Sequence, residues 1–377
     1  MTSKAAPAGL PPVTGAWRPG DPRGRRQWLP VDRSLRLDAG GVLPAYTFAY
    51  ETWGRLNSDA SNAVLIEHAL TGDSHAAGEA GPGHPTPGWW DGLIGPGRAL
   101  DTSELFVVVP NILGGCQGTT GPASPDPDGK PWGSRFPQVT VRDQVHAEAE
   151  LADALGIERW ALVVGGSMGG MRALEWAVTL PARVESLLVV AAPAAASAEQ
   201  IAWASPQLHA IRSDPGWRGG DYYDAAPGDG PHRGLGIARR IAHVTYRSEP
   251  ELGRRFGRRR QSAADERFAI ESYLDHHADK LVRRFDANSY LLLTESMNTH
   301  DVGRDRSGVG EALSRITART VVAGVDSDRL YPLYQSNDLA AGIPGAGDAV
   351  VISSPYGHDS FLIETLQIAA LVKSLLG

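Results

Sequence analysis

The sequence predicts an α/β protein with a mostly parallel central sheet and a helical insertion in its second half. Short apolar runs, such as residues 63–66 and 161–164, alternate with segments of helical character, and this alternation is typical of parallel sheets. A serine flanked by glycines, Ser167, follows one of these runs and precedes a helix-like segment. After residue 192 the strand pattern stops, and it returns at residue 320, which indicates the insertion.

The first half of the chain supplies most of the expected strands. The earliest alternates loosely and is rich in aromatic residues, so we expect it to be antiparallel. The runs that follow are apolar, as in strands buried on both faces. A helix is expected over residues 141–155, because Gly156 is a typical residue at a helix C-terminus. The expected strands cover residues 42–53, 63–66, 105–110, 159–164 and 184–192.

The second half of the chain begins with helices and ends with strands. We expect helices over residues 197–211, 235–249, 263–274 and 289–297, then strands over 320–324 and 349–352, and a last helix over 361–376. This order divides the chain into a core of residues 28–192 and 311–377 and a helical lid of residues 193–310. Residues 1–27, rich in Pro, Gly and Ala, are expected to be a disordered tail.

Composition argues against several classes of protein. A net charge of −7 argues against a general nucleic-acid binder. The single cysteine, Cys116, excludes an internal disulfide and a multi-cysteine metal site, and we expect no metal. No apolar run is long enough to span a membrane, and residues 1–27 lack the apolar core of a signal peptide. We therefore expect a soluble, cytoplasmic protein.

The segment around Ser167 has the pattern of a catalytic nucleophile. Gly165, Ser167 and Gly169 form a G-x-S-x-G motif between a strand and a helix, where a sharp turn exposes the serine hydroxyl. Backbone N–H groups at the start of the helix can stabilise an oxyanion. We predict that Met168 provides one such N–H group and that Leu70, in the loop after strand 63–66, provides the second.

A serine nucleophile needs a histidine base and a carboxylate that orients it, and on this type of sheet they follow in the order Ser, Asp, His. Asp328 follows the strand at 320–324, and His358 follows the strand at 349–352. Asp326 is a competing acid in the same loop. His300 precedes both of these strands, so it would break the chain order as a base.

Two charged residues suggest what the site binds. Arg239 lies in a predicted lid helix and shares one face with His243 and Tyr246, while Asp359 directly follows His358. A guanidinium and a carboxylate on opposite sides of a pocket suit the two charges of an amino acid. From the residues alone the protein is a serine acyl-transfer enzyme whose acceptor, water or another hydroxyl, stays undecided.

Six motifs together resemble the homoserine O-acetyltransferases of the α/β-hydrolase superfamily. The resemblance extends from about residue 43 to residue 377, and the set is much more specific than the serine motif alone. The motifs are HALTGDSH (68–75), GHPTPGWW (83–90), WGSRFP (132–137), GGSMGG (165–170), SDRLYP (327–332) and YGHD (356–359).

The resemblance implies an α/β-hydrolase fold and a ping-pong reaction in L-methionine biosynthesis. Acetyl-CoA, a co-substrate rather than a bound cofactor, would acetylate Ser167, and L-homoserine would then accept the acetyl group. The resemblance assigns Asp328 and His358 to the triad, Leu70 and Met168 to the oxyanion hole, and Arg239 and Asp359 to homoserine. It also implies a homodimer formed through the lid.

Other activities of the same scaffold stay open. A succinyl donor or a serine acceptor would require only a few changes in the pocket, and an esterase or thioesterase would use the same triad. A non-catalytic binding module is disfavoured because all three triad residues are present. The arginine-rich block at residues 254–260 is expected to be a solvated lid surface, with contact to CoA phosphates as the alternative.

Overall fold

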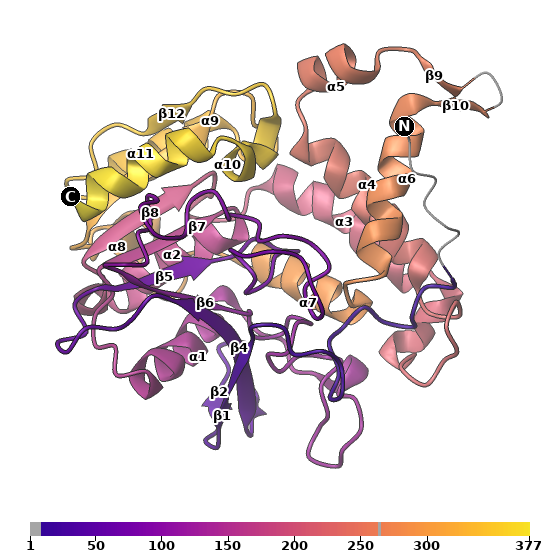
Figure 1. Cartoon of the computed structure of the whole chain (residues 1–377), viewed down its shortest axis with the longest axis horizontal. Helices are drawn as coiled ribbons and strands as arrows, with labels where there is room; N and C mark the ends of the chain where they lie inside the picture. Colours follow the sequence, from indigo (N-terminus) through magenta and orange to yellow (C-terminus); the bar gives the residue numbers. More distant parts are fainter. Residues whose placement is uncertain (1–8, 263–264) are drawn as a thin grey trace.

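The computed structural model describes residues 9–262 and 265–377, and it contains an eight-stranded sheet between helical layers (Figure 1). The pairs β1–β4 and β4–β6 are antiparallel, and the other neighbouring strands are parallel, as predicted. In spatial order the strands are β1 (Gln27–Val31), β4 (Tyr46–Trp53), β6 (Phe106–Pro110), β5 (Ala63–Glu67), β7 (Leu162–Gly166), β8 (Ser186–Val190), β11 (Arg319–Val325) and β12 (Val350–Ile352).

The central strands are apolar throughout because both faces of the sheet are covered. Every residue of β5, β7 and β8 is buried. Successive side chains point to opposite faces: Leu65 belongs to the core that includes α1 (Val141–Ala154), and Val64 belongs to the core that includes α11 (Thr365–Leu376). Because the central strands run parallel, their carboxyl ends all lie at the same edge of the sheet.

Two groups of helices surround this sheet. Those of the core are α1, α2 (Met168–Thr179), α9 (Leu333–Gly342), α10 (Ser360–Ile363) and α11. Those of the lid gather beyond the carboxyl ends of the strands (Figure 1), and they are α3 (Ala198–Arg212), α4 (His232–Tyr246), α5 (Glu249–Phe256), α6 (Ala269–Val282) and α7 (Ala287–Asn298). The short helix α8 (Val309–Leu313) lies apart from them and packs against the core. The described residues also form two small antiparallel pairs, β2 (Leu35–Arg36) with β3 (Val42–Leu43) and β9 (Arg260–Ser262) with β10 (Asp265–Phe268).

The amino-terminal segment differs from the disordered tail expected over residues 1–27. Residues 1–8 lie outside the described residues, but from residue 9 onward the segment follows the lid and the core. The Thr14 hydroxyl donates a hydrogen bond to the buried Asp286 carboxylate at 2.8 Å. Further backbone hydrogen bonds join Gly15 to Phe285 and Trp17 to Cys116. The expectation of disorder is therefore wrong for this part. Its composition did not reveal these contacts because the partners lie far away in the sequence.

One predicted lid helix begins later than expected. The helix predicted over residues 263–274 starts at Ala269 in the structure, and residues 263–264 lie outside the described residues. Asp265–Phe268 instead pairs with Arg260–Ser262 as an antiparallel hairpin. The Glu271 carboxylate accepts the Phe268 N–H at 2.6 Å, which stabilises the helix start at this point.

Among the helices formed by residues 9–262 and 265–377, none combines the length and the apolar character that crossing a membrane requires.

Candidate active site

Ser167 occupies a sharp turn between β7 and α2. Its backbone angles, φ 58° and ψ −127°, lie in a region that L-residues rarely adopt. A Cβ atom on Gly165 would lie 2.2 Å from a backbone atom of Gly169, and one on Gly169 would lie 2.0 Å from the Glu67 carbonyl oxygen. The glycines therefore let β7, α2 and the end of β5 approach closely enough to form the turn that presents the serine.

His358 and Asp328 meet from two different strand ends. The Asp328 Oδ2 atom accepts a hydrogen bond from His358 Nδ1 at 2.6 Å, and both side chains are buried. The other oxygen of Asp328 accepts the N–H groups of Leu330 and Tyr331 at 2.8 and 2.9 Å. His358 Nε2 has no hydrogen-bond partner among the described residues, so the ring presents an unpaired nitrogen to the cavity that Ser167 also lines.

Ser167 and His358 line one cavity with a volume of about 1260 Å³, its open mouth included. The walls come from the loop after β5, the lid helices α4 and α6, and the segment that follows β12. Among the residues that line it are Leu70, Ser167, Arg239, Tyr246, His358 and Asp359. The structure thus brings together side chains that lie up to almost 290 positions apart, all beyond the carboxyl edge of the sheet.

The competing acid and base from the sequence are engaged elsewhere. Asp326 accepts hydrogen bonds from the Ser353 hydroxyl at 2.8 Å and the Ser354 N–H at 3.1 Å. His300 is buried and contacts the carbonyl of Pro193 at 3.2 Å. Burial raises the pKa of Cys116 to about 12, which leaves its thiol protonated and unreactive.

The two donors expected to stabilise an oxyanion are the backbone N–H groups of Leu70 and Met168, near Ser167. Met168 is the first residue of α2, so its N–H has no carbonyl one turn earlier in the helix to bond. Leu70 lies in a turn closed by a hydrogen bond from the Gly72 N–H to the Ala69 carbonyl at 2.8 Å. Both residues are buried.

Arg239 and Asp359 line the cavity from different elements, α4 and the segment after β12. Arg239 Nη1 donates to the Thr71 hydroxyl at 3.4 Å. Burial raises the pKa of Asp359, while the charges of His358, Arg239 and Arg247 oppose that rise. A guanidinium and a carboxylate therefore line the same cavity.

Several residues in or beside the cavity were missed by the sequence reasoning. Arg247 donates to Asp359 at 3.3 Å, so this carboxylate already has one cationic partner. His277, Lys280 and Arg284 bring more basic groups to the wall from α6 and its end. Their spacing of three and four positions, typical of one helix face, was the available signal. The arginine block at 254–260 lies in α5 and β9, outside the set of described residues that line the cavity.

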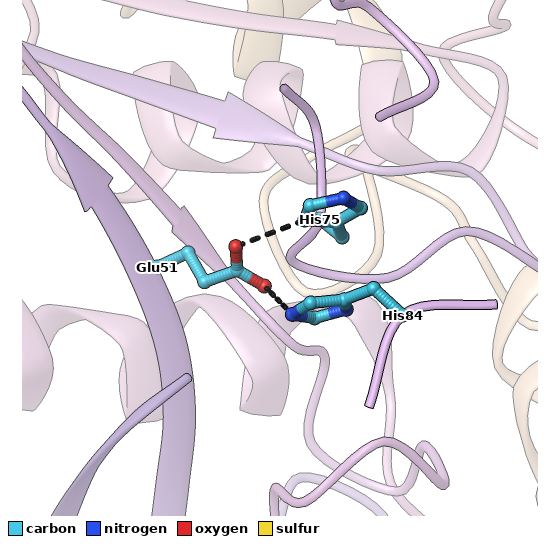
Figure 2. A group of neighbouring side chains, drawn as sticks. All are labelled: Glu51, His75 and His84. Carbon is cyan, nitrogen blue, oxygen red and sulfur yellow. Dashed lines mark hydrogen bonds and ion pairs between the residues drawn. The ribbon is translucent and has the colours of Figure 1, made fainter. Parts of the chain in front are cut away.

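Glu51, His75 and His84 form a buried cluster beside the cavity, and Figure 2 shows both imidazoles directed at the same carboxylate. His75 Nδ1 lies 3.1 Å from one oxygen of Glu51, and His84 Nε2 lies 3.3 Å from the other. The two rings stack with centroids 3.8 Å apart and planes 8° from parallel. Nitrogen lone pairs in parallel planes do not converge on one point, which is poor geometry for a shared metal ion.

Hydrogen bonds account for this cluster instead. The Ser74 hydroxyl donates to Glu51 at 2.9 Å, and the Arg25 backbone N–H donates to His84 Nε2 at 3.1 Å. Burial lowers the pKa of His84 to about 4, so it is neutral. Burial opposes a charge on His75 too, but its hydrogen bond to Glu51 raises the pKa overall. The cluster therefore joins β4 to the end of the loop that carries Leu70.

Comparisons with known proteins agree with this geometry. The sequence model of the alpha/beta hydrolase fold matches residues 62–365. Homoserine O-acetyltransferase of Thermobifida fusca is 64% identical over 369 residues, which are 97% of each chain. This chain belongs to the homoserine O-acetyltransferase family. The relative from Clavibacter michiganensis, with the same name, is 57% identical over 98% of this chain and 96% of its own.

Solved structures have the same fold. Homoserine O-acetyltransferase from Bacillus anthracis superposes with a TM-score of 0.84 at 28% identity, over 93% of this chain and 97% of its own. An acetylester hydrolase from Corynebacterium glutamicum superposes with a TM-score of 0.80 at 28% identity, over 94% and 96% of the two chains. The family's architecture thus accompanies both a transferase and a hydrolase, and the predicted α/β-hydrolase fold is confirmed.

Proposed function

We propose that this chain transfers the acetyl group of acetyl-CoA to the side-chain hydroxyl of L-homoserine, as a step of L-methionine biosynthesis. The observation that carries the proposal is the set of residues that line one cavity. Ser167 and His358 line it together with Arg239 and Asp359, so a nucleophile and its base lie beside two opposite charges. Membership of the homoserine O-acetyltransferase family supports the same assignment.

In the first half-reaction Ser167 becomes acetylated. His358 Nε2 accepts the hydroxyl proton of Ser167 while Oγ attacks the thioester carbonyl carbon. The N–H groups of Leu70 and Met168 stabilise the resulting oxyanion, and each such donor contributes on the order of 3 kcal/mol to lowering the barrier. The C–S bond then breaks, and His358 returns the proton to the departing sulfur, so that CoA leaves as a thiol.

In the second half-reaction the acetyl group passes to homoserine. His358 Nε2 takes the proton of the substrate hydroxyl as its oxygen attacks the acetyl carbonyl carbon. The bond to Ser167 Oγ breaks, and Oγ recovers the proton from His358. Arg239 binds the substrate carboxylate and Asp359 its ammonium group, which directs the side-chain hydroxyl at the acetyl-serine. No bound cofactor or metal is part of the proposal.

The lid and the oligomer are part of the same proposal. We divide the chain into a core of residues 28–192 and 311–377 and a lid of residues 193–310, and we propose a cytoplasmic homodimer formed through the lid. Exposed apolar side chains on the lid helices α3 and α4 support that interface, because contact with a second copy would remove their apolar surface from water. They are Ile201, Trp203 and Ile237, which are 41%, 37% and 47% exposed.

A hydrolase is the second candidate, favoured by the structural likeness to an acetylester hydrolase. Mass spectrometry of the intact protein after brief exposure to acetyl-CoA or succinyl-CoA separates the candidates. We expect an acetyl adduct on Ser167 that persists in water and disappears on addition of L-homoserine. Equally fast loss in water alone would indicate a hydrolase. A succinyl adduct, or discharge to L-serine, would change the donor or the acceptor.

A further inference from the structure

The peptide group between Ala69 and Leu70 is held at its carbonyl end. His68 Nδ1 lies 2.8 Å from the Ala69 oxygen, and the Gly72 N–H donates to the same oxygen at 2.8 Å. In a trans peptide the C=O and N–H bonds are rigidly antiparallel. Two donors on the Ala69 oxygen therefore also fix the direction in which the Leu70 N–H points.

The protonation state of the His68 ring follows from its second contact. The Ile112 N–H donates to His68 Nε2 at 3.2 Å, so Nε2 carries no proton and Nδ1 is the donor to Ala69. Burial, with the nearby charge of Arg172, lowers the pKa of His68 to about 3, and the ring is neutral at physiological pH. The His68 ring thus fastens its own loop to the loop after β6.

Arg172 fastens this loop to the helix that carries the second oxyanion donor. Its side chain is fully buried, and Nη2 donates to the His68 carbonyl at 2.8 Å. Nη1 forms ion pairs with Glu67 at 2.5 Å and with Glu148 at 2.7 Å. Arg172 belongs to α2, whose first residue is Met168. One guanidinium therefore connects the two segments that present the Met168 and Leu70 N–H groups.

We propose that His68 and Arg172 are positioning residues that fix the Leu70 N–H in the direction needed to stabilise the oxyanion. This inference rests on the proposed acetylation of Ser167. Neither side chain is among those that line the cavity in the described residues, so neither contacts the substrate. Their role is to keep two backbone donors aligned before the reaction, because a donor that must reorient during the reaction loses most of its effect.

Paired variants of His68 separate positioning from packing. His68→Asn keeps a donor at the place of Nδ1, whereas His68→Phe keeps an aromatic ring but removes that donor. We expect the rate of Ser167 acetylation by acetyl-CoA to fall roughly 10- to 100-fold in His68→Phe, part of the effect of losing an oxyanion donor. In His68→Asn we expect a loss of less than about fivefold, with the KM for acetyl-CoA unchanged in both.

Variants of α2 provide the second arm. Arg172→Lys keeps a positive charge for the carboxylates but lacks the planar fork that also reaches the His68 carbonyl, so we expect slower acetylation at unchanged KM. Trp176→Phe is the matched control. It removes the Trp176 hydrogen bond to Glu148 at 3.0 Å, which weakens the same buried cluster without touching His68. We expect this control to lower the melting temperature and to keep the wild-type acetylation rate.

The outcomes distinguish this inference from the proposed function. If the wild-type protein does not form an acetyl-enzyme, the proposed function itself fails. If the wild-type protein is acetylated and His68→Phe, folded by circular dichroism, reacts at the wild-type rate, the positioning role is wrong. A rate loss in Trp176→Phe as large as in Arg172→Lys would also overturn the inference, because it would reflect general loosening. Should Arg172→Lys fail to fold, the His68 pair decides alone.

Discussion

The Nδ1 atom of His358 lies 2.6 Å from the Oδ2 atom of Asp328, although the two residues follow different strands. This hydrogen bond fixes the tautomer of the ring, since a proton on Nδ1 leaves Nε2 as the acceptor. The acceptor nitrogen has no partner among the described residues, and it belongs to the wall of the cavity that also contains Ser167.

Asp328→Asn should lower kcat by about 10⁴-fold, because the amide stabilises the wrong tautomer of His358 and no imidazolium. The matched control is Asp326→Asn, in the same loop, whose carboxylate bonds Ser353 and Ser354 instead. We expect the control to retain activity within a few-fold. Steady-state assay of CoA release measures both, and a larger loss in Asp326→Asn would exchange the roles of the two acids.

Asp359→Asn should impair the homoserine half-reaction selectively. The neutral amide loses the charge that binds the substrate ammonium, a change on the order of 2 kcal/mol. We expect the KM for homoserine to rise roughly 10- to 100-fold, while the rate of acetyl-enzyme formation stays near that of the wild type. Rapid-quench measurement of each half-reaction tests this, and an equal loss in both would argue against an ammonium-binding role.

Ser167→Gly should be at least as stable as the wild-type protein, even though it is inactive. Ser167 has φ 58° and ψ −127°, and such backbone strain costs on the order of 1–3 kcal/mol in a residue with a Cβ atom. Glycine relieves this strain, at an entropic cost of about 0.5–1 kcal/mol. Urea denaturation should therefore rank Ser167→Gly above Ser167→Ala in free energy of unfolding; the reverse order would show that the turn is relaxed.

Gly169→Ala should prevent proper folding of the site. The added Cβ would lie 2.0 Å from the Glu67 carbonyl oxygen, a backbone atom that cannot move without breaking the contact of α2 with the end of β5. The control is Gly310→Ala in α8, where nothing lies within 4 Å of the new atom. There the substitution should raise the free energy of unfolding by up to about 1 kcal/mol. Thermal melts of both variants measure the contrast.

The stability of the protein should decrease as the pH falls below 6.5. His68 has its pKa lowered to about 3 and His84 to about 4 by burial, against an ordinary value of 6.5. Between these values the unfolded chain binds protons that the folded chain excludes, so protonation favours unfolding. Each histidine should cost about 2 kcal/mol between pH 7 and pH 5.

His68→Asn tests the size of this pH effect. Because asparagine does not titrate, the loss of unfolding free energy between pH 7 and pH 5 should be smaller in the variant by about 2 kcal/mol. Urea denaturation at the two pH values gives the difference directly. Equal losses in the two proteins would mean that the pKa of His68 is not lowered by folding.

The sequence was most informative where burial is complete. The strands β5, β7 and β8 were predictable because every residue in them is buried, which leaves an uninterrupted apolar run. The order of Ser167, Asp328 and His358 was predictable because each stands just after a strand. Asp328 was predicted as the acid with Asp326 as its competitor, since both are carboxylates in one loop, and the three-dimensional path shows that Asp328 contacts the imidazole.

Features that depend on distant partners were not predictable. Residues 9–27 look like a flexible tail by composition, yet Thr14 bonds a residue 272 positions away. Arg247 was missed because its contact with Asp359 spans 112 positions. His68 and Arg172 were missed as well, since their contacts with Ile112 and Glu148 join segments that are separate in the sequence. Local sequence reports local preference, and these contacts depend on how separate elements meet.

The contacts of the amino-terminal segment also constrain when the protein can fold during its synthesis. The Thr14 hydroxyl can bond Asp286 only after residue 286 has been synthesised. The five residue pairs between β8 and β11 likewise form only after the whole lid has been synthesised. On a ribosome, which releases the amino end first, the amino-terminal segment and the outer edge of β8 therefore remain without these neighbours until most of the chain has emerged. We expect nascent chains that stop before residue 319 to depend on chaperones, however stable the completed enzyme is.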